Sequence, residues 1–159
     1  MNIEHHPILQ RIAQTYDLPV ALVSAIVLVE SSGDPFAMRY EPLFFKRYVE
    51  KQPGLKAIAP CSFDSERIAR ATSWGLMQVM GQTARERGFN GPFLSALCAI
   101  ETGLEYGCKH LAYLANHYFK GSWHPVIAAY SAGSPRQVGD HYVNQNYVDK
   151  VIARYERLA

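Results

Sequence analysis

Apolar residues recur along this chain every three or four positions, the spacing of one helix face, and no segment shows the strict alternation of a half-buried strand. The pattern predicts a mainly α protein with a small β-ribbon in residues 50–62 or 68–80. Helices are expected over residues 3–16, 19–32, 42–50, 81–87, 99–119 and 140–157, with two more opening at Ser62 and in the segment HPVIAAYSAGSP. Because 159 residues can enclose a sizeable core, we expect one domain over residues 1–159.

Several residues mark where these helices begin and end. Pro19 suits a first helical position, with Asp17 upstream as a cap, and Ser62 is a candidate N-cap. Gly133 and Pro135 should end the helix that precedes them.

Two glycines lie four residues apart on the longest predicted helix. Gly103 and Gly107 each lower the stability of an isolated helix, so their presence there needs a physical reason. We predict that another backbone approaches the helix closely at this point.

Charge and composition exclude some classes of protein. A net charge of +2 is too small to indicate nucleic-acid binding. The longest apolar run, PVALVSAIVLV, is too short to cross a bilayer, so we expect a buried core helix and no stable membrane insertion. The first residues lack the features of a signal peptide, which predicts synthesis in the cytoplasm. No cysteine or histidine cluster has metal-ligand spacing, and whether Cys98 and Cys108 pair is left open.

One carboxyl group ends an unusually apolar helix. Val23, Ile26, Val27 and Glu30 share one helix face, and the sequence SGDP then turns the chain to the surface. Partial desolvation disfavours the charged form of a carboxyl group. Glu30 is therefore a candidate general acid, able to hold a proton and give it to a leaving oxygen. The alternative is a helix-end glutamate that reaches solvent or pairs with an arginine.

Three downstream segments favour the functional interpretation of Glu30. In SWGLMQVM, Gln78 is a polar amide among apolar neighbours and needs partners, which a ligand could supply. In AAYSAGSP, Tyr130 precedes a helix end, and YVDKVIARY follows near the C-terminus.

Four motifs in this order resemble the lytic transglycosylase catalytic domain. They are Glu-Ser with Gly-Asp-Pro, then Gly-Leu-Met-Gln, then Ala-Ala-Tyr-x-Ala-Gly, and a terminal Tyr-Val-x-x-Val. This is the soluble lytic transglycosylase and goose-type lysozyme group, and the resemblance runs from about residue 8 to residue 155. It implies a lysozyme-like fold. The compact size further resembles the phage and prophage endolysins of this group.

The resemblance also implies roles for individual residues. Glu30 would be the single catalytic acid/base, and Ser31 would help to fix the helix end. Gln78 and Met80 would line the sugar cleft. Tyr130 would lie close to the catalytic glutamate, with Tyr147 in the closing helix as a weaker candidate.

The implied substrate is the glycan strand of peptidoglycan, cut between N-acetylmuramic acid and N-acetylglucosamine. The acid would protonate the glycosidic oxygen, and the substrate's own N-acetyl oxygen would stabilise the positive charge. The same group, now a base, would deprotonate the C6 hydroxyl and close a 1,6-anhydro ring. No metal and no organic cofactor is implied.

This sequence departs from the family pattern in three places. Ser131 stands where the family usually has Asn. The segment between Glu30 and Gly75 is longer than in many members and contains YEPLFFKRY, which reads either as an aromatic flap or, as we favour, as packing. The closing helix lacks the acidic residue that many members carry before Tyr-Val.

Other functions remain to be compared with the transglycosylase. Glu41 could serve as a second carboxylate and make the enzyme a muramidase that uses water, although a cap or surface role for Glu41 is favoured. A non-catalytic wall-binding virion protein is disfavoured by the intact Glu30, and a DNA-binding domain by the lack of a basic stripe. We expect a monomer that acts on the cell wall after release through a holin-type pore or delivery in a virion.

Overall fold

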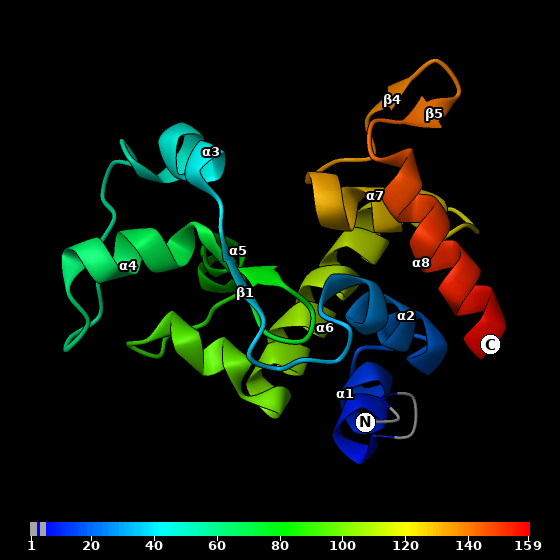
Figure 1. The fold of residues 1–159 in the computed structure, drawn as a ribbon, viewed down its shortest axis with the longest axis horizontal. Helices are drawn as coiled ribbons and strands as arrows, with labels where there is room; N and C mark the ends of the chain where they lie inside the picture. The colour runs from blue at the N-terminus through cyan, green and yellow to red at the C-terminus, as the bar shows by residue number, and fades with distance from the viewer. Residues whose placement is uncertain (1–2, 4–5) are drawn as a thin grey trace. The chain divides into compact units, whose positions relative to one another are not determined.

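The computed structural model describes residue 3 and residues 6–159, and it is mainly α as expected (Figure 1). The described chain divides into two compact units. One unit contains the described residues up to Val29 together with Cys108–Ala159, and the other is Glu30–Gly107. Each unit is described separately below.

The first unit is built from helices around an aliphatic core. Its helices are α1 (Pro7–Thr15), α2 (Val20–Glu30, as far as Val29), the second half of α6 (Ile100–Tyr118), α7 (His124–Ala132) and α8 (Gln145–Leu158). Fully buried side chains from these helices form the core: Leu9, Ile12, Leu22, Ile26, Leu111, Ile127, Val148 and Val151.

Three predicted helix starts in this unit need correction or remain open. The helix predicted from residue 3 starts at Pro7, a favoured first position, while residues 4 and 5 lie outside the described part of the chain. Asp17 does not cap α2, because its φ of 53° places it in the turn that ends α1. The last helix begins at Gln145 and not at residue 140.

A short hairpin occupies the residues where that last helix was expected to start. Strands β4 (Gln137–Val138) and β5 (His141–Tyr142) pair antiparallel. Gly139 lies between them with a φ of 61°, a conformation in which glycine pays no steric penalty. At the end of α7, Gly133 adopts a left-handed conformation with a φ of 78°, as predicted for a helix stop.

The second unit carries a three-stranded antiparallel sheet in the order β1 (Met38–Tyr40), β2 (Thr72–Trp74), β3 (Val79–Met80). The ribbon predicted in residues 68–80 is therefore confirmed, whereas residues 50–62 form turns and loop. Strand β1 was not expected. The unit also contains α3 (Pro42–Phe44), the π-helix η2 (Phe45–Val49), α4 (Phe63–Arg70), α5 (Gly81–Glu86) and the 3-10 helix η3 (Leu94–Cys98).

Helix α4 starts as its sequence predicts and holds the preceding segment in place. The Ser62 side chain accepts a hydrogen bond from the Ser65 backbone N–H at 3.2 Å. Arg67 donates to the carbonyl of Glu50 at 3.0 Å, and its guanidinium lies 5.1 Å from the centre of the Phe45 ring. Part of the YEPLFFKRY segment is therefore packed, as favoured above.

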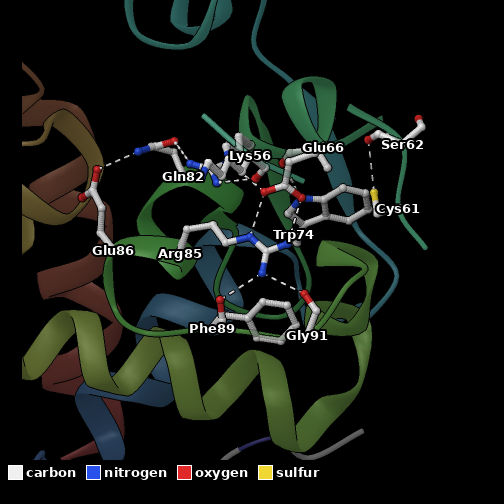
Figure 2. A network of polar contacts seen from close by, with 12 residues as sticks. Lys56, Cys61, Ser62, Glu66, Trp74, Gln82, Arg85, Glu86, Phe89 and Gly91 are labelled. Atoms are coloured by element: carbon white, nitrogen blue, oxygen red, sulfur yellow. Dashed lines mark hydrogen bonds and ion pairs between the residues drawn. The ribbon is translucent and has the colours of Figure 1, made fainter. Parts of the chain in front are cut away.

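A buried ionic network joins α4 to α5 (Figure 2). The Glu66 side chain is completely buried and accepts hydrogen bonds from Arg70 at 2.7 Å and from Arg85 at 2.8 Å on each carboxylate oxygen. Arg85 also donates to the carbonyls of Phe89 and Gly91. Burial alone would raise the pKa of Glu66, but the hydrogen bonds and charges of Arg85 and Arg70 outweigh it and lower that pKa.

The two glycines of α6 meet different neighbours. A Cβ atom at Gly103 would collide with the backbone carbonyl of Leu97, so the predicted close approach of a backbone is confirmed there. At Gly107 the space is filled by the side chain of Met77, so the prediction was wrong for that residue.

Gly103→Ala is expected to lower the free energy of unfolding by about 1–3 kcal/mol, because the new methyl group must displace a backbone carbonyl. Urea denaturation followed by circular dichroism would measure it. At an exposed helix position, replacing glycine by alanine would instead raise the free energy of unfolding by about 1 kcal/mol. A stabilised variant would therefore contradict the packing described here.

Among the described residues, no single helix is long and apolar enough to cross a membrane. The pair α1 and α2 meets that criterion only in combination and is bent by 119°. None of the three cysteines forms a disulfide, so the pairing of Cys98 with Cys108 left open above is not made.

Candidate active site

Glu30 is the last residue of α2 and is half-buried. The residues before it on the same face, Val23, Ile26 and Val27, are fully buried, as the sequence pattern predicted. The helix ends immediately afterwards, since Ser32 and Gly33 have φ values of 54° and 82°. The carboxyl group of Glu30 thus lies where a core helix reaches the surface.

Ser31 fastens this helix end to the Gly-Leu-Met-Gln segment. Its hydroxyl donates to the carbonyl of Leu76 at 2.8 Å and accepts from the backbone N–H of Gly33 at 3.3 Å. Two sequence motifs separated by 45 residues are therefore joined by one hydrogen bond. The position of the Glu30 backbone is set by this contact.

The Gly-Leu-Met-Gln segment forms the turn between β2 and β3. Gly75 and Gln78 have φ values of 70° and 47°, and a side chain at Gly75 would collide with the carbonyl of Leu97. Leu76 and Met77 are buried in the core of the unit. Residue 75 must therefore be glycine for two reasons: its left-handed backbone conformation, and the lack of space for a side chain.

Gln78 finds its hydrogen-bond partners inside the protein. Its amide nitrogen donates to the carbonyls of Ala37 and Gly75 at 2.9 and 3.0 Å, and its oxygen accepts from the Ser73 hydroxyl at 2.9 Å. A ligand is therefore not needed to satisfy the hydrogen bonds of Gln78, and its role in lining the sugar cleft stays a prediction. Gln78 instead ties the turn to the segment that follows Glu30, because Ala37 belongs to that segment.

Met80 ends β3 and is half-buried. In the antiparallel register Ser73 lies opposite both Met80 and Arg39, so these three side chains share one face of the sheet. Ser73 was not singled out from the sequence, although it lies two residues before Gly75. Its hydrogen bond to Gln78 places it in the same polar group.

Glu41 forms an ion pair with Arg39. Its carboxylate accepts a hydrogen bond from Arg39 Nε at 2.5 Å, and its backbone N–H donates to the carbonyl of Ala71 at 2.8 Å. Glu41 does occupy the N-cap position of α3, but its side chain makes no capping hydrogen bond. Of the cap or surface role that was favoured, the side chain makes no cap, and its observed contact is an ion pair with the exposed Arg39.

The two candidate tyrosines belong to the other unit. Tyr130 lies near the end of α7, half-buried, with its ring centre 5.6 Å from that of His110. Tyr147 lies in the first turn of α8 and is also half-buried. Asn144, which precedes α8, donates a hydrogen bond to the carbonyl of Ala128 on α7 at 3.0 Å and so links the two helices.

Cys98 lies close to the turn but does not have the character of a nucleophile. Burial, and then the negative charge of Asp34, raises the pKa of its thiol. The described residues contain no group of three or more histidine, cysteine, aspartate or glutamate side chains that could hold a metal ion.

A glutamate at the end of a core helix, fastened by its neighbouring serine to a Gly-Leu-Met-Gln turn, defines a lytic-transglycosylase type of domain. The chain matches the transglycosylase SLT domain family over residues 7–149 and belongs to that family.

Solved structures share the fold. The lytic transglycosylase Slt from Pseudomonas aeruginosa, in the form of an inactive mutant, aligns with a TM-score of 0.57 and 18% identity over 97% of this chain. The 70-kDa soluble lytic transglycosylase of Escherichia coli aligns with a TM-score of 0.55 and 19% identity, also over 97% of this chain. The chain spans 22% and 19% of those two proteins, respectively.

An endolysin of Enterobacteria phage PRD1 is similar in sequence. The two are 33% identical over 60 residues, which cover 33% of this chain and 40% of the endolysin.

Proposed function

We propose that this protein is a peptidoglycan lytic transglycosylase in which Glu30 is the acid/base. The observation that carries the proposal is the hydrogen bond from Ser31 to Leu76, because it joins the helix end that bears Glu30 to the family's Gly-Leu-Met-Gln turn. Family membership supports the reaction class. The Pseudomonas aeruginosa relative was solved as an inactive mutant with glutamine in place of a glutamate, which supports a glutamate as the essential group.

The proposed reaction cleaves the bond between N-acetylmuramic acid and N-acetylglucosamine. Glu30 protonates the glycosidic oxygen, and the substrate's N-acetyl oxygen stabilises the positive charge at the sugar carbon. Glu30, now a carboxylate, removes the proton of the C6 hydroxyl, whose oxygen closes the 1,6-anhydro ring. No water is consumed, and Glu30 ends the cycle protonated.

In this proposal residues 1–159 are one catalytic domain. The family match covers both units, and the candidate residues are distributed between them. Glu30, Ser31, Gln78 and Met80 come from Glu30–Gly107, and Tyr130 and Tyr147 come from the other unit.

The biological role proposed is wall degradation of the phage-lysis type, supported by the similarity to the phage PRD1 endolysin. The enzyme would act as a monomer on glycan strands in the cell wall, reached through a holin-type pore or by delivery in a virion.

Mass spectrometry of muropeptides released from purified peptidoglycan tests the reaction. Products that lack one water relative to reducing muropeptides are expected, since these carry 1,6-anhydro ends. Reducing ends would show that water is the acceptor, and the enzyme would then be a muramidase. If no product formed, the non-catalytic wall-binding function would replace the proposal.

Glu41→Gln is expected to leave the 1,6-anhydro product unchanged and to alter the rate by less than about threefold, because the Glu41 carboxylate is already paired with Arg39. The same mass-spectrometric assay, with timed sampling, measures both quantities. A hydrolytic wild-type enzyme that lost activity in this variant would identify Glu41 as the water-positioning carboxylate.

A further inference from the structure

A cavity lies within Glu30–Gly107, between η2 and α5. Its volume is about 400 Å³, within the range of about 300–1,000 Å³ typical of ligand sites. Six residues line it: Phe44, Tyr48, Gln52, Gln82, Thr83 and Glu86. None of them belongs to the site described above.

One wall is aromatic. The rings of Phe44 and Tyr48 lie 4.8 Å apart between centres at an angle of 50°, and Tyr48 is 54% exposed. Tyr48 belongs to η2, and π-helical turns are rare and occur frequently at functional sites. The segment that carries this wall lies between Glu30 and Gly75, in the stretch that the resemblance led us to expect to be longer than in many family members.

The other wall is polar and comes from one helix. Gln82, Thr83 and Glu86 lie on α5, where Gln82 donates a hydrogen bond to Glu86 at 3.0 Å (Figure 2). Gln52 completes the lining, and its side-chain oxygen is buried with no hydrogen-bond donor among the described residues.

Both walls are anchored to α4, so the cavity has a rigid base. Arg67 of α4 holds the end of η2 through the carbonyl of Glu50 at 3.0 Å. Arg70 of α4 donates to the side-chain oxygen of Gln82 at 3.2 Å, and the Glu66–Arg85 pair fastens α5 to α4. The buried network therefore fixes the geometry of the polar wall.

This combination of groups fits a saccharide. A sugar ring offers an apolar C–H face that packs on an aromatic ring, and hydroxyl groups that pair with amide, hydroxyl and carboxylate side chains. Among the described residues that line the cavity, Glu86 is the only charged one, and its negative charge disfavours a phosphate or another anion. A single carboxylate is also too few for a dedicated metal site.

The polar wall of the cavity follows Met80 directly in the sequence. Met80 is the N-cap residue of α5, and Gln82 and Thr83 follow within the first turn of that helix. The polar wall therefore begins within three residues of Met80, a candidate for lining the sugar cleft.

We propose that this cavity is a distal subsite that binds one neutral N-acetylhexosamine unit of the glycan strand, beyond the residues that take part in cleavage. The subsite rests on the proposed function, and it makes long strands better substrates than short ones. Tyr48 supplies the packing surface, and Thr83 with Glu86 and Gln52 supplies the hydrogen bonds.

Kinetics on purified glycan strands of defined length test the subsite. Tyr48→Ala is expected to reduce the ratio of kcat/KM for long strands to that for short strands by about fivefold, mainly through KM on the long strands. Thr83→Val should reduce the ratio by about threefold, and Thr83→Ser should restore it. Phe93→Ala is the matched control, since Phe93 is 48% exposed on the same unit but does not line the cavity.

Binding is tested separately from cleavage. Chitohexaose, a neutral N-acetylglucosamine oligomer, is titrated into the Glu30→Gln protein and followed by NMR of the side-chain amides. Shifts of the Gln52 and Gln82 amides are expected, and Tyr48→Ala should abolish them without changing the melting temperature by more than a few degrees.

The outcomes separate the two proposals. A wild-type protein that cuts no glycan would overturn the proposed function, while the titration would still report on the cavity. An active protein whose length preference is the same in Tyr48→Ala, Thr83→Val and Phe93→Ala, with no shifts of the Gln52 and Gln82 amides, would overturn the subsite alone.

Discussion

Glu30→Gln is expected to lower the rate of glycan cleavage by at least about a thousandfold, because one carboxyl group serves as both acid and base in the proposed reaction. Glutamine keeps the size of the side chain but cannot transfer the proton. The fold is expected to be unchanged, because glutamine has nearly the same shape and Glu30 is only half-buried at the end of α2. Release of soluble muropeptides at fixed enzyme concentration measures the effect.

A matched control removes a carboxylate elsewhere. Glu156→Gln changes an exposed residue of α8 and should leave the rate within about twofold of the wild type. Glu30→Asp keeps the carboxyl group but shortens the side chain by one methylene. Its cleavage rate should lie between those of the wild type and Glu30→Gln. Activity of Glu30→Gln within tenfold of the wild type would show that another group transfers the proton.

Glu66→Gln is expected to lower the free energy of unfolding by about 3–5 kcal/mol, because it leaves Arg70 and Arg85 without their buried counter-charge. Urea denaturation at neutral pH measures the loss. Asp64→Asn is the control on the same helix, since Asp64 is 91% exposed and lies 3.8 Å from Arg67. Asp64→Asn should lower the free energy of unfolding by less than about 1 kcal/mol. Equal effects of the two changes would contradict the stabilising role assigned to the network.

The same network predicts how stability depends on pH. The pKa of Glu66 is lower in the folded protein than its ordinary value of 4.5, so the folded state binds the proton less readily than the unfolded state does. The contribution of Glu66 to stability is therefore fully present above pH 4.5 and is lost as the pH falls through the folded pKa. Glu66→Gln should reduce this acid-dependent loss, which denaturation curves at a series of pH values below 4.5 would detect.

Local signals in the sequence predicted much of the helical structure. Ser62 caps α4, and Gly133 ends α7, because capping depends on backbone groups within a few residues of the cap. The position of Glu30 at the end of an apolar helix also followed from the spacing of Val23, Ile26 and Val27.

Short strands were harder to predict. β1 and the hairpin β4–β5 have three residues or fewer in each strand, too few to show an alternating pattern. β1 forms because residues more than thirty positions later supply its partner strand, as the pairing of Met38 with Trp74 shows. Nothing in the local sequence carries that information.

By itself, the sequence determined the mainly α class, most helix boundaries and the family, since periodicity, caps and motif order are properties of neighbouring residues. The tertiary structure alone decided the surroundings of the chemical groups: the partners of Gln78, the pairing of Glu41 with Arg39, and the burial of Glu66. The physical reason is that burial and hydrogen bonding depend on which distant segments the fold brings together.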